Sequence, residues 1–289
     1  ILAHPPNIVD DTQRRSYFEQ GYLHLESFLS TELLARLSAA FAELIERHRH
    51  QTASDDDVLI EDDHSPQEPR YKRMNRATDQ HRALWTYAAN SVLTELVSDL
   101  VGPSVRFRES YINCKSPLGG DRIDWHQDFP FFPHTNKAML TTLTFLEDVS
   151  ADMGPIMMYP GSHRGVLYDH YNADGSWAGK VSDAELAALD KNDAVSLCGP
   201  AGTVVVFDCC MLHGSEPNGS SRSRPLLLNG YSAGDAFCYT SLPANMRATQ
   251  AFSIVRGESP AYAHHEPATV KLPPDWGRQQ YVNIFDAQK

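Results

Sequence analysis

The run "DWHQDFPFFP", residues 124–133, holds the pair of side chains best suited to bind a metal ion. His126 and Asp128 are two positions apart, and residues i and i+2 of a strand face the same side, so an imidazole and a carboxylate can point to one ion. The pair alone carries little weight, because 13 His and 23 Asp among 289 residues give 13 × 23 / 289, about one such pair, by chance. A metal site needs further ligands.

A third candidate ligand, His213, lies near the end of the apolar run "GTVVVFDCCMLHG". If this run is one regular strand, counting in twos places Cys209, Phe207 and Val205 on the face of His213, which makes that face apolar and directed to the core. A buried imidazole needs a hydrogen-bond partner or a metal. Asp128 and His213 are 85 residues apart (213 − 128), enough for intervening strands to bring them together. Two histidines and one carboxylate with open positions are the ligand set that holds non-haem Fe(II).

Arg224 adds a group that binds carboxylates. It follows His213 by 11 residues (224 − 213) and leads into the apolar run "PLLLNGY". A guanidinium directed into a β-barrel is costly unless it meets a carboxylate, which its planar fork binds with two parallel hydrogen bonds. The sequence therefore combines three metal ligands with one anion-binding group.

The elements that must position these residues change in kind along the chain. Residues 10–102 read as helices around one short strand at "YLHLES", with Ser30 as the N-cap of a long helix and Gly102 ending the last one. From residue 104 the pattern becomes a series of short β-rich runs separated by Gly, Pro, Asn and Asp. This order predicts a mainly β fold, a sandwich or barrel with flanking helices.

We expect one domain over residues 1–289, with a helical cover at about 10–102, a β core at about 104–240 and an irregular C-terminal tail. The acidic segment 53–69 is expected to be a solvated loop. A polar insertion at 165–195 contains a short helix and acts as a lid or as a surface excursion; the sequence leaves both open.

The composition of the chain limits the kinds of partner that it can bind. The formal charge is −12, which disfavours nucleic acids and anionic membranes, since clustered Lys and Arg bind both. The sequence shows neither an apolar run long enough for a membrane span nor the pattern of a signal peptide. Five cysteines, an odd number without CxxC spacing, argue against a disulfide framework and favour a reducing cytoplasm. The oligomeric state is left open.

Three motifs in order, "DWHQDFPFF", "MMYPGSHRG" and "LHGSEPNGSSRSR", resemble the phytanoyl-CoA dioxygenase family of Fe(II)- and 2-oxoglutarate-dependent oxygenases, which includes ectoine hydroxylase. The similarity runs from about residue 105 to 235. It implies a double-stranded β-helix, or jelly-roll, core and a reaction that uses Fe(II), 2-oxoglutarate and O2. Halogenating relatives lack the carboxylate ligand, and because Asp128 is present here, the resemblance favours hydroxylation.

The resemblance also assigns roles to individual residues. It implies that His126, Asp128 and His213 bind iron. Arg224 and Ser215 would hold the distal carboxylate of 2-oxoglutarate, and Asn113 would also face this cosubstrate. From the residues themselves, Thr142 on the strand "MLTTLTF" is a further candidate to reach it, although threonines are common on strands for their shape alone.

Candidate substrate contacts surround the metal ligands in sequence. Phe129, Phe131 and Phe132, stiffened by neighbouring prolines, are predicted to form an apolar wall that excludes water, with at least one of them packed in the core. His134 is either a substrate contact or an exposed loop histidine.

Arg73 belongs to the basic cluster "RYKRMNR", residues 70–76. This cluster either binds an anionic group of the substrate or forms a solvated patch that answers the acidic segment before it. We expect the protein to hydroxylate an unactivated C–H bond of a specialised metabolite or small carboxylic acid. An acyl-CoA is the weaker alternative, because one basic cluster is little for the phosphates of CoA.

The identity of the substrate and the position oxidised cannot be read from the sequence. The same chemistry can also end in desaturation, epoxidation or cyclisation. Two readings from other classes stay open. One is a metal-binding sensor without turnover, and the other is a cupin-like metalloenzyme that uses no cosubstrate and in which Arg224 is structural.

Overall fold

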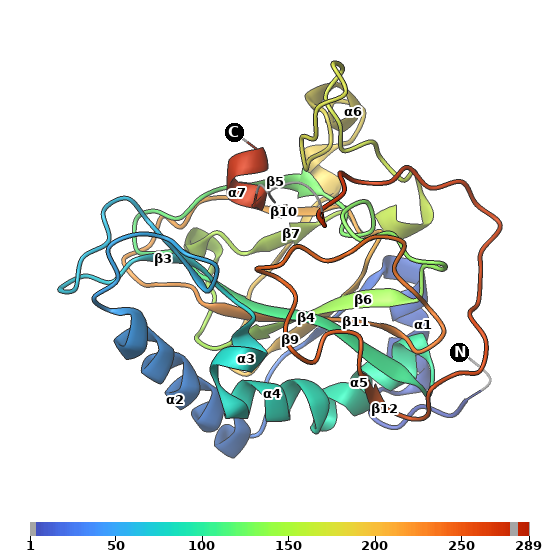
Figure 1. The fold of residues 1–289 in the computed structure, drawn as a ribbon, viewed down its shortest axis with the longest axis horizontal. Coiled ribbons are helices and arrows are strands. Elements are labelled where there is room, and N and C mark those ends of the chain that lie inside the picture. The colour runs from blue at the N-terminus through green and yellow to red at the C-terminus, as the bar shows by residue number, and fades with distance from the viewer. Residues whose placement is uncertain (1–3, 278–282, 289) are drawn as a thin grey trace.

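The computed structural model describes residues 4–277 and 283–288. Two antiparallel sheets lie face to face, and helices cover the outer face of the larger one (Figure 1). In spatial order the larger sheet consists of β1 (Tyr22–Leu25), β9 (Val204–Asp208), β6 (Met139–Phe145), β11 (Leu226–Ala233), β4 (Val105–Asn113), β3 (Tyr71–Asn75) and β2 (Val58–Ile60), and β12 (Ile254–Arg256) also pairs with β4. The smaller sheet consists of β5 (Ile123–His126), β10 (His213–Ser215), β7 (Ile156–Met158) and β8 (Val195–Leu197).

Side-chain alternation along the strands explains the layers. On β11, Leu226 and Leu228 face the smaller sheet, where they join an apolar cluster with Met158 of β7. Leu227 faces the opposite way and packs among the helices, with Leu96 among its neighbours in that cluster. Because successive strand residues point to opposite faces, a strand that is apolar at every position is buried on both sides.

The helices have the boundaries that their capping residues dictate. Ser30 accepts a hydrogen bond from the Leu33 backbone N–H and begins the long helix, and Gly102, at φ 114°, ends α5, as predicted. The helices are α1 (Asp11–Gln20), α2 (Thr31–His48), α3 (Ala77–Gln80), α4 (Arg82–Ala89), α5 (Val92–Val101), α6 (Asp183–Leu186) and α7 (Ile284–Ala287). Among the described residues, none of these helices is long and apolar enough to cross a membrane.

The structure corrects two expectations for the N-terminal part. The acidic segment 53–69 is not entirely loop, because β2 lies inside it and pairs with β3. The cover therefore holds two further strands, β2 and β3, besides the expected strand β1, and all three extend the main sheet of the core. The insertion holds the expected short helix, α6, and the part of the tail that the structure describes, up to residue 277 and over 283–288, is irregular apart from β12 and α7.

The chain around His213 also differs from the expectation of one regular strand. β9 ends at Asp208, residues 209–212 turn, and β10 begins at His213 in the smaller sheet. Counting in twos from His213 back to Phe207 was therefore wrong as a description of the backbone. The two rings nonetheless meet, with centroids 4.7 Å apart, because the turn carries the chain across the interior from one sheet to the other.

Candidate metal centre

The two histidines are held opposite each other by strand pairing. His126 is the last residue of β5 and His213 the first of β10, and the two are direct partners in the antiparallel register. Their ring centroids are 4.1 Å apart. A pair of imidazoles at this spacing, fixed by the backbone of two strands, is arranged before any ion binds.

Each ring is oriented by a backbone carbonyl. Nδ1 of His126 donates to the carbonyl oxygen of Asp124 at 2.8 Å, and Nδ1 of His213 donates to that of Met211 at 2.9 Å. Because a carbonyl only accepts, both Nδ1 atoms carry the proton and both Nε2 atoms present a lone pair. Burial, followed by the nearby His213, lowers the pKa of His126 well below its usual value. The neutral ring is the form that binds metals.

Asp128 completes the set from the turn after β5 rather than from the strand itself. Its Oδ1 lies 3.8 Å from Nε2 of His126 and 3.7 Å from Nε2 of His213. Its Oδ2 accepts a hydrogen bond from the Thr141 hydroxyl at 2.7 Å, which leaves Oδ1 for an ion. One ligand atom from each of the three residues lies within 4.8 Å of the others, as ligands of a single ion require. Sequence reasoning missed Thr141, although it expected this strand, because alternation alone does not tell which face of the strand looks to the metal.

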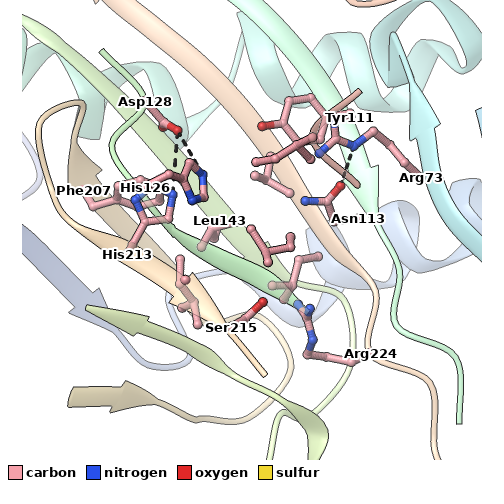
Figure 2. A pocket seen from close by; sticks show the side chains of 16 residues that line it. Arg73, Tyr111, Asn113, His126, Asp128, Leu143, Phe207, His213, Ser215 and Arg224 are labelled. Atoms are coloured by element: carbon pink, nitrogen blue, oxygen red, sulfur yellow. Dashed lines mark hydrogen bonds and ion pairs between the residues drawn. The ribbon is translucent and has the colours of Figure 1, made fainter. Parts of the chain in front are cut away.

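These ligands stand at one side of a cavity between the sheets. Figure 2 shows Arg73, Asn113 and Tyr111 across from them, and Arg224 near Ser215 at the far end. Leucines and isoleucines of both sheets supply most of the remaining lining. The cavity therefore has a metal-binding side, a cationic end and apolar walls between them.

Arg224 is buried without a counter-charge. Its side chain is 2% exposed, and within the described part of the chain its Nε and Nη1 have no hydrogen-bond partner. Burial lowers its pKa to about 10, so the group stays charged at neutral pH. A buried, unpaired guanidinium is costly unless an anion joins it. Ser215, two residues beyond His213 on β10, lines the same cavity with its hydroxyl.

Asn113 and Arg73 lie together across the cavity from the metal ligands. Nε of Arg73 donates to Oδ1 of Asn113 at 2.7 Å, which leaves the Asn113 amide N–H groups as donors. The guanidinium of Arg73 lies over the Tyr111 ring, 4.3 Å from its centroid. Both Arg73 and Asn113 line the cavity, as their predicted contacts with substrate and cosubstrate require.

The phenylalanines divide into two groups. Phe131 and Phe132 line a smaller pocket that adjoins the cavity, together with Asp128. Phe129 does not line either space and packs in an apolar cluster with Cys209 and Leu242. Two of the three rings thus occupy the place expected of a substrate wall, and one belongs to the core.

Two of the candidate residues lie away from the cavity. Thr142 faces the helices, and its hydroxyl donates to the backbone oxygen of Asn229 at 3.2 Å, because strand alternation turns Thr141 and Leu143 inward instead. His134 is buried rather than exposed, and its Nδ1 donates to the Phe132 backbone oxygen at 2.6 Å. Neither position offers contact with a ligand in the cavity.

Gln127, which alternation points away from the metal, ties the insertion to the site. Its Oε1 accepts from the Tyr168 backbone N–H at 2.9 Å, and its Nε2 donates to the backbone oxygens of Cys210 and Val166 at 2.7 and 3.1 Å. Trp177 of the insertion then packs against Phe131, with ring centroids 5.0 Å apart. The insertion therefore backs the substrate wall, a role that the sequence left open.

Ile284 of α7 lines both the cavity and the smaller pocket, and no sequence motif indicated it. A second group with metal-ligand atoms, Asp208, Cys209 and Cys210, lies behind the site. Burial raises the pKa of Cys209 well above its usual value, so this thiol stays protonated, and a protonated thiol is a poor metal ligand. Among the described residues, His126, Asp128 and His213 are the better metal site.

Comparisons with known proteins agree with this geometry. A model of the family named phytanoyl-CoA dioxygenase (PhyH) matches residues 17–226. The probable alpha-ketoglutarate-dependent hypophosphite dioxygenase of Stutzerimonas stutzeri is 34% identical over 228 residues, which cover 78% of this chain and 79% of that protein. The ectoine dioxygenase of Sphingopyxis alaskensis is 28% identical over 221 residues, 71% of this chain and 70% of that protein.

Solved structures show the same fold. EctD from S. alaskensis with bound Fe superposes with a TM-score of 0.66 at 24% identity, covering 89% of this chain and 87% of that one. The alpha-ketoglutarate-dependent carbocyclase SnoK from nogalamycin biosynthesis gives a TM-score of 0.63 at 23% identity, covering 81% and 89%. The predicted fold class, mainly β with a jelly-roll core, is confirmed. The chain belongs to the phytanoyl-CoA dioxygenase family of Fe(II)- and 2-oxoglutarate-dependent oxygenases.

Proposed function

We propose that this dioxygenase hydroxylates an unactivated C–H bond of a small molecule. The observation that carries the proposal is the joint placement, around one cavity, of a two-histidine, one-carboxylate cluster and a buried arginine that has no anionic partner among the described residues. The first is the ligand set for non-haem iron and the second is the group that holds the far end of a dicarboxylate.

The residues present fit the metal and the cosubstrate. His126, Asp128 and His213 would hold Fe(II), and three protein ligands leave positions for the cosubstrate and O2. When bound, iron with 2-oxoglutarate and O2 supplies the oxidising power for hydroxylation, with succinate and CO2 as co-products. Arg224 and Ser215 would bind the distal carboxylate of 2-oxoglutarate.

The remaining task of the chain is orientation and exclusion of water. Thr141 holds Oδ2 of Asp128, so the carboxylate presents its other oxygen in one direction. Asn113 has its amide oxygen occupied by Arg73 and keeps its N–H groups for an acceptor in the cavity, which supports its cosubstrate role. Phe131 and Phe132 close the pocket beside Asp128 with apolar surface, which keeps water from the reacting carbon.

The space beside the metal ligands supports a small substrate. The pocket between Asp128 and the phenylalanines is small, which favours a compact substrate over an acyl-CoA. A second candidate is oxidation of a P–H bond in hypophosphite, because the relative named for that reaction is 34% identical over 228 residues. Both candidates use the same cavity and the same cosubstrate.

The decisive measurement is succinate release from 2-oxoglutarate with Fe(II) and ascorbate. A panel of small acids, amino acids, hypophosphite and acyl-CoAs should include at least one compound that stimulates release by the wild type. His126→Ala and Arg224→Ala should abolish it, whereas the exposed Arg222→Ala, two residues from Arg224, should not. A wild type that releases no succinate with any compound would favour the sensor reading. Turnover without 2-oxoglutarate would favour the cupin reading.

A cytoplasmic location without nucleic-acid or membrane partners is part of the same proposal. The formal charge of −12, which repels polyanions, supports the absence of these partners, and the odd number of cysteines without CxxC spacing supports the compartment. Cell fractionation and a nucleic-acid binding assay at low salt test it. Recovery in the membrane fraction, or binding to DNA at low salt, would contradict it.

A further inference from the structure

The cavity contains a second buried guanidinium, that of Arg73. The side chain is 4% exposed and lines both the cavity and the smaller pocket beside Asp128. Nε of Arg73 is bound to Asn113, and the guanidinium carbon lies 4.3 and 5.0 Å from the ring centroids of Tyr111 and Phe285. The group is thus held rigidly by one hydrogen bond and two aromatic contacts.

Arg73 differs from the other cations of its own strand region. Arg70 pairs with Glu61 and Asp63 at 3.1 and 2.9 Å, and Lys72 pairs with Asp121 at 2.9 Å. Arg76 pairs with Asp57. Arg70 and Arg76 of the basic cluster thus form ion pairs with carboxylates of the acidic segment 53–69.

Among residues 4–277 and 283–288, no carboxylate forms an ion pair with Arg73. The nearby carboxylate of Glu109 pairs with Arg108 at 2.7 Å instead, and burial raises its pKa above the usual value in spite of Arg108 and Arg73. A buried charge without a counter-ion is unfavourable, and a site that keeps one gains affinity when an anion arrives. Arg73 therefore has the features of an anion-binding group.

The position of Arg73 relative to the metal ligands indicates which anion it would bind. Arg224, in the deep part of the cavity, serves the cosubstrate. Arg73 borders the shallower pocket, where His126 and Asp128 form one side and Phe131 and Phe132 another. A molecule in this pocket can place one anionic group on Arg73 while an apolar part rests on the phenylalanines beside the metal.

We propose that Arg73 binds the anionic group of the substrate, and that the substrate is a small oxyanion, either a carboxylate or a phosphorus oxyacid. This rests on the proposed function, because it takes the pocket beside Asp128 to be the place of oxidation. The small size of this pocket favours a compact molecule. The planar fork of arginine suits two oxygens of either group.

The test measures binding without turnover, to protein that carries Zn(II) in place of iron and is saturated with 2-oxoglutarate. Calorimetry compares hypophosphite, isobutyrate and L-proline with dimethylphosphine oxide, isobutyramide and L-prolinamide, which lack the anionic group. The variants are Arg73→Gln, Arg73→Lys and, as a matched control on the same strand, Lys72→Gln. Affinity for 2-oxoglutarate is measured for each protein first.

We expect at least one anion to bind the wild type far more tightly than its uncharged counterpart. Arg73→Gln should weaken that binding on the order of 100-fold, the loss expected when one partner of a buried charge pair is removed. Arg73→Lys should restore part of it, and Lys72→Gln should leave it unchanged. Whether the carboxylate or the phosphorus acid binds decides between the two sources of the oxyanion.

Several results would overturn the proposal: no anion of the panel binds the wild type, the uncharged compounds bind equally well, or Arg73→Gln keeps full affinity. Loss of 2-oxoglutarate binding in Arg73→Gln would assign Arg73 to the cosubstrate instead. If this variant does not fold, the comparison of charged and uncharged compounds on the wild type still decides. A wild type that does not bind 2-oxoglutarate would refute the proposed function itself, and this result appears before any substrate probe is added.

Discussion

At the scale of single residues, the hydrogen bond from Thr141 to Asp128 sets how the carboxylate faces the metal. Thr141→Val keeps the shape of the side chain and removes the donor. We expect the affinity for Fe(II) or Co(II) to fall by about 10- to 100-fold, as for other groups that orient metal ligands. Metal titration of the purified protein measures it.

The adjacent Thr142→Val is the matched control, because its hydroxyl bonds only a backbone oxygen on the other face of β6. This change should leave metal affinity unaltered. Equal losses in the two variants would mean that the strand, and not the hydrogen bond, supports the site.

We expect replacement of the buried Arg224 to have opposite effects on the stability of the protein and on its binding of 2-oxoglutarate. Its pKa is lowered to about 10 because it is buried and charged with no carboxylate partner among the described residues, so the empty site is destabilised. Arg224→Met should raise the free energy of unfolding of the ligand-free protein by about 1–3 kcal/mol. The same variant should lose 2-oxoglutarate binding. Chemical denaturation and calorimetry measure the two effects, and a less stable variant would show that Arg224 has a structural role.

At the scale of the elements, the side chain of Gln127, just after β5, holds the insertion through hydrogen bonds with the backbone of Tyr168 and Val166. A third hydrogen bond, to the backbone oxygen of Cys210, ties it to the turn between β9 and β10. Gln127→Met leaves the buried backbone oxygen of Cys210 unpaired, at about 1–3 kcal/mol, and removes the two partly buried hydrogen bonds that hold Val166 and Tyr168. We expect faster hydrogen exchange and faster proteolysis around residues 166–178, with the core strands unaffected. The exposed Asn192→Ala in the same insertion is the control. Unchanged exchange in Gln127→Met would contradict the anchoring role.

The elements also show what could be predicted from the sequence. Motif spacing identified His126, Asp128, His213 and Arg224, and the alternating strand pattern with capping residues predicted the layers. The pairing partner of a strand, however, depends on contacts far away in the chain. That is why the sequence did not reveal the passage from β9 to β10, the support from Thr141, or the inward turn of Thr141 in place of Thr142.

At the scale of the whole molecule, buried histidines make stability depend on pH. Burial lowers the pKa of His134 to about 3, so the folded state keeps this ring neutral while the unfolded chain protonates it below its usual pKa of about 6.5. Its contribution to stability is therefore complete above that value and is lost as the pH falls towards 3. His170, with a pKa lowered to about 4 by burial, acts in the same direction.

His134→Gln should reduce this acid dependence. Between pH 6 and pH 4 we expect the slope of unfolding free energy against pH to decrease by about 1.4 kcal/mol per unit, which is one proton. Urea denaturation across this range measures it, with the exposed His265→Gln as control. Identical slopes in the wild type and His134→Gln would show that other groups govern the acid response.

The arrangement of the two sheets gives the cavity a mechanical role. His126 and His213 belong to the smaller sheet. Arg224 lies just before β11 of the larger sheet, and Thr141 lies on β6 of the same larger sheet. A ligand that contacts both the metal held by His126 and His213 and the guanidinium of Arg224 would therefore connect the two sheets. Binding of metal and 2-oxoglutarate should therefore reduce the motion of the two sheets relative to each other. This connection would be broken and formed again in each turnover.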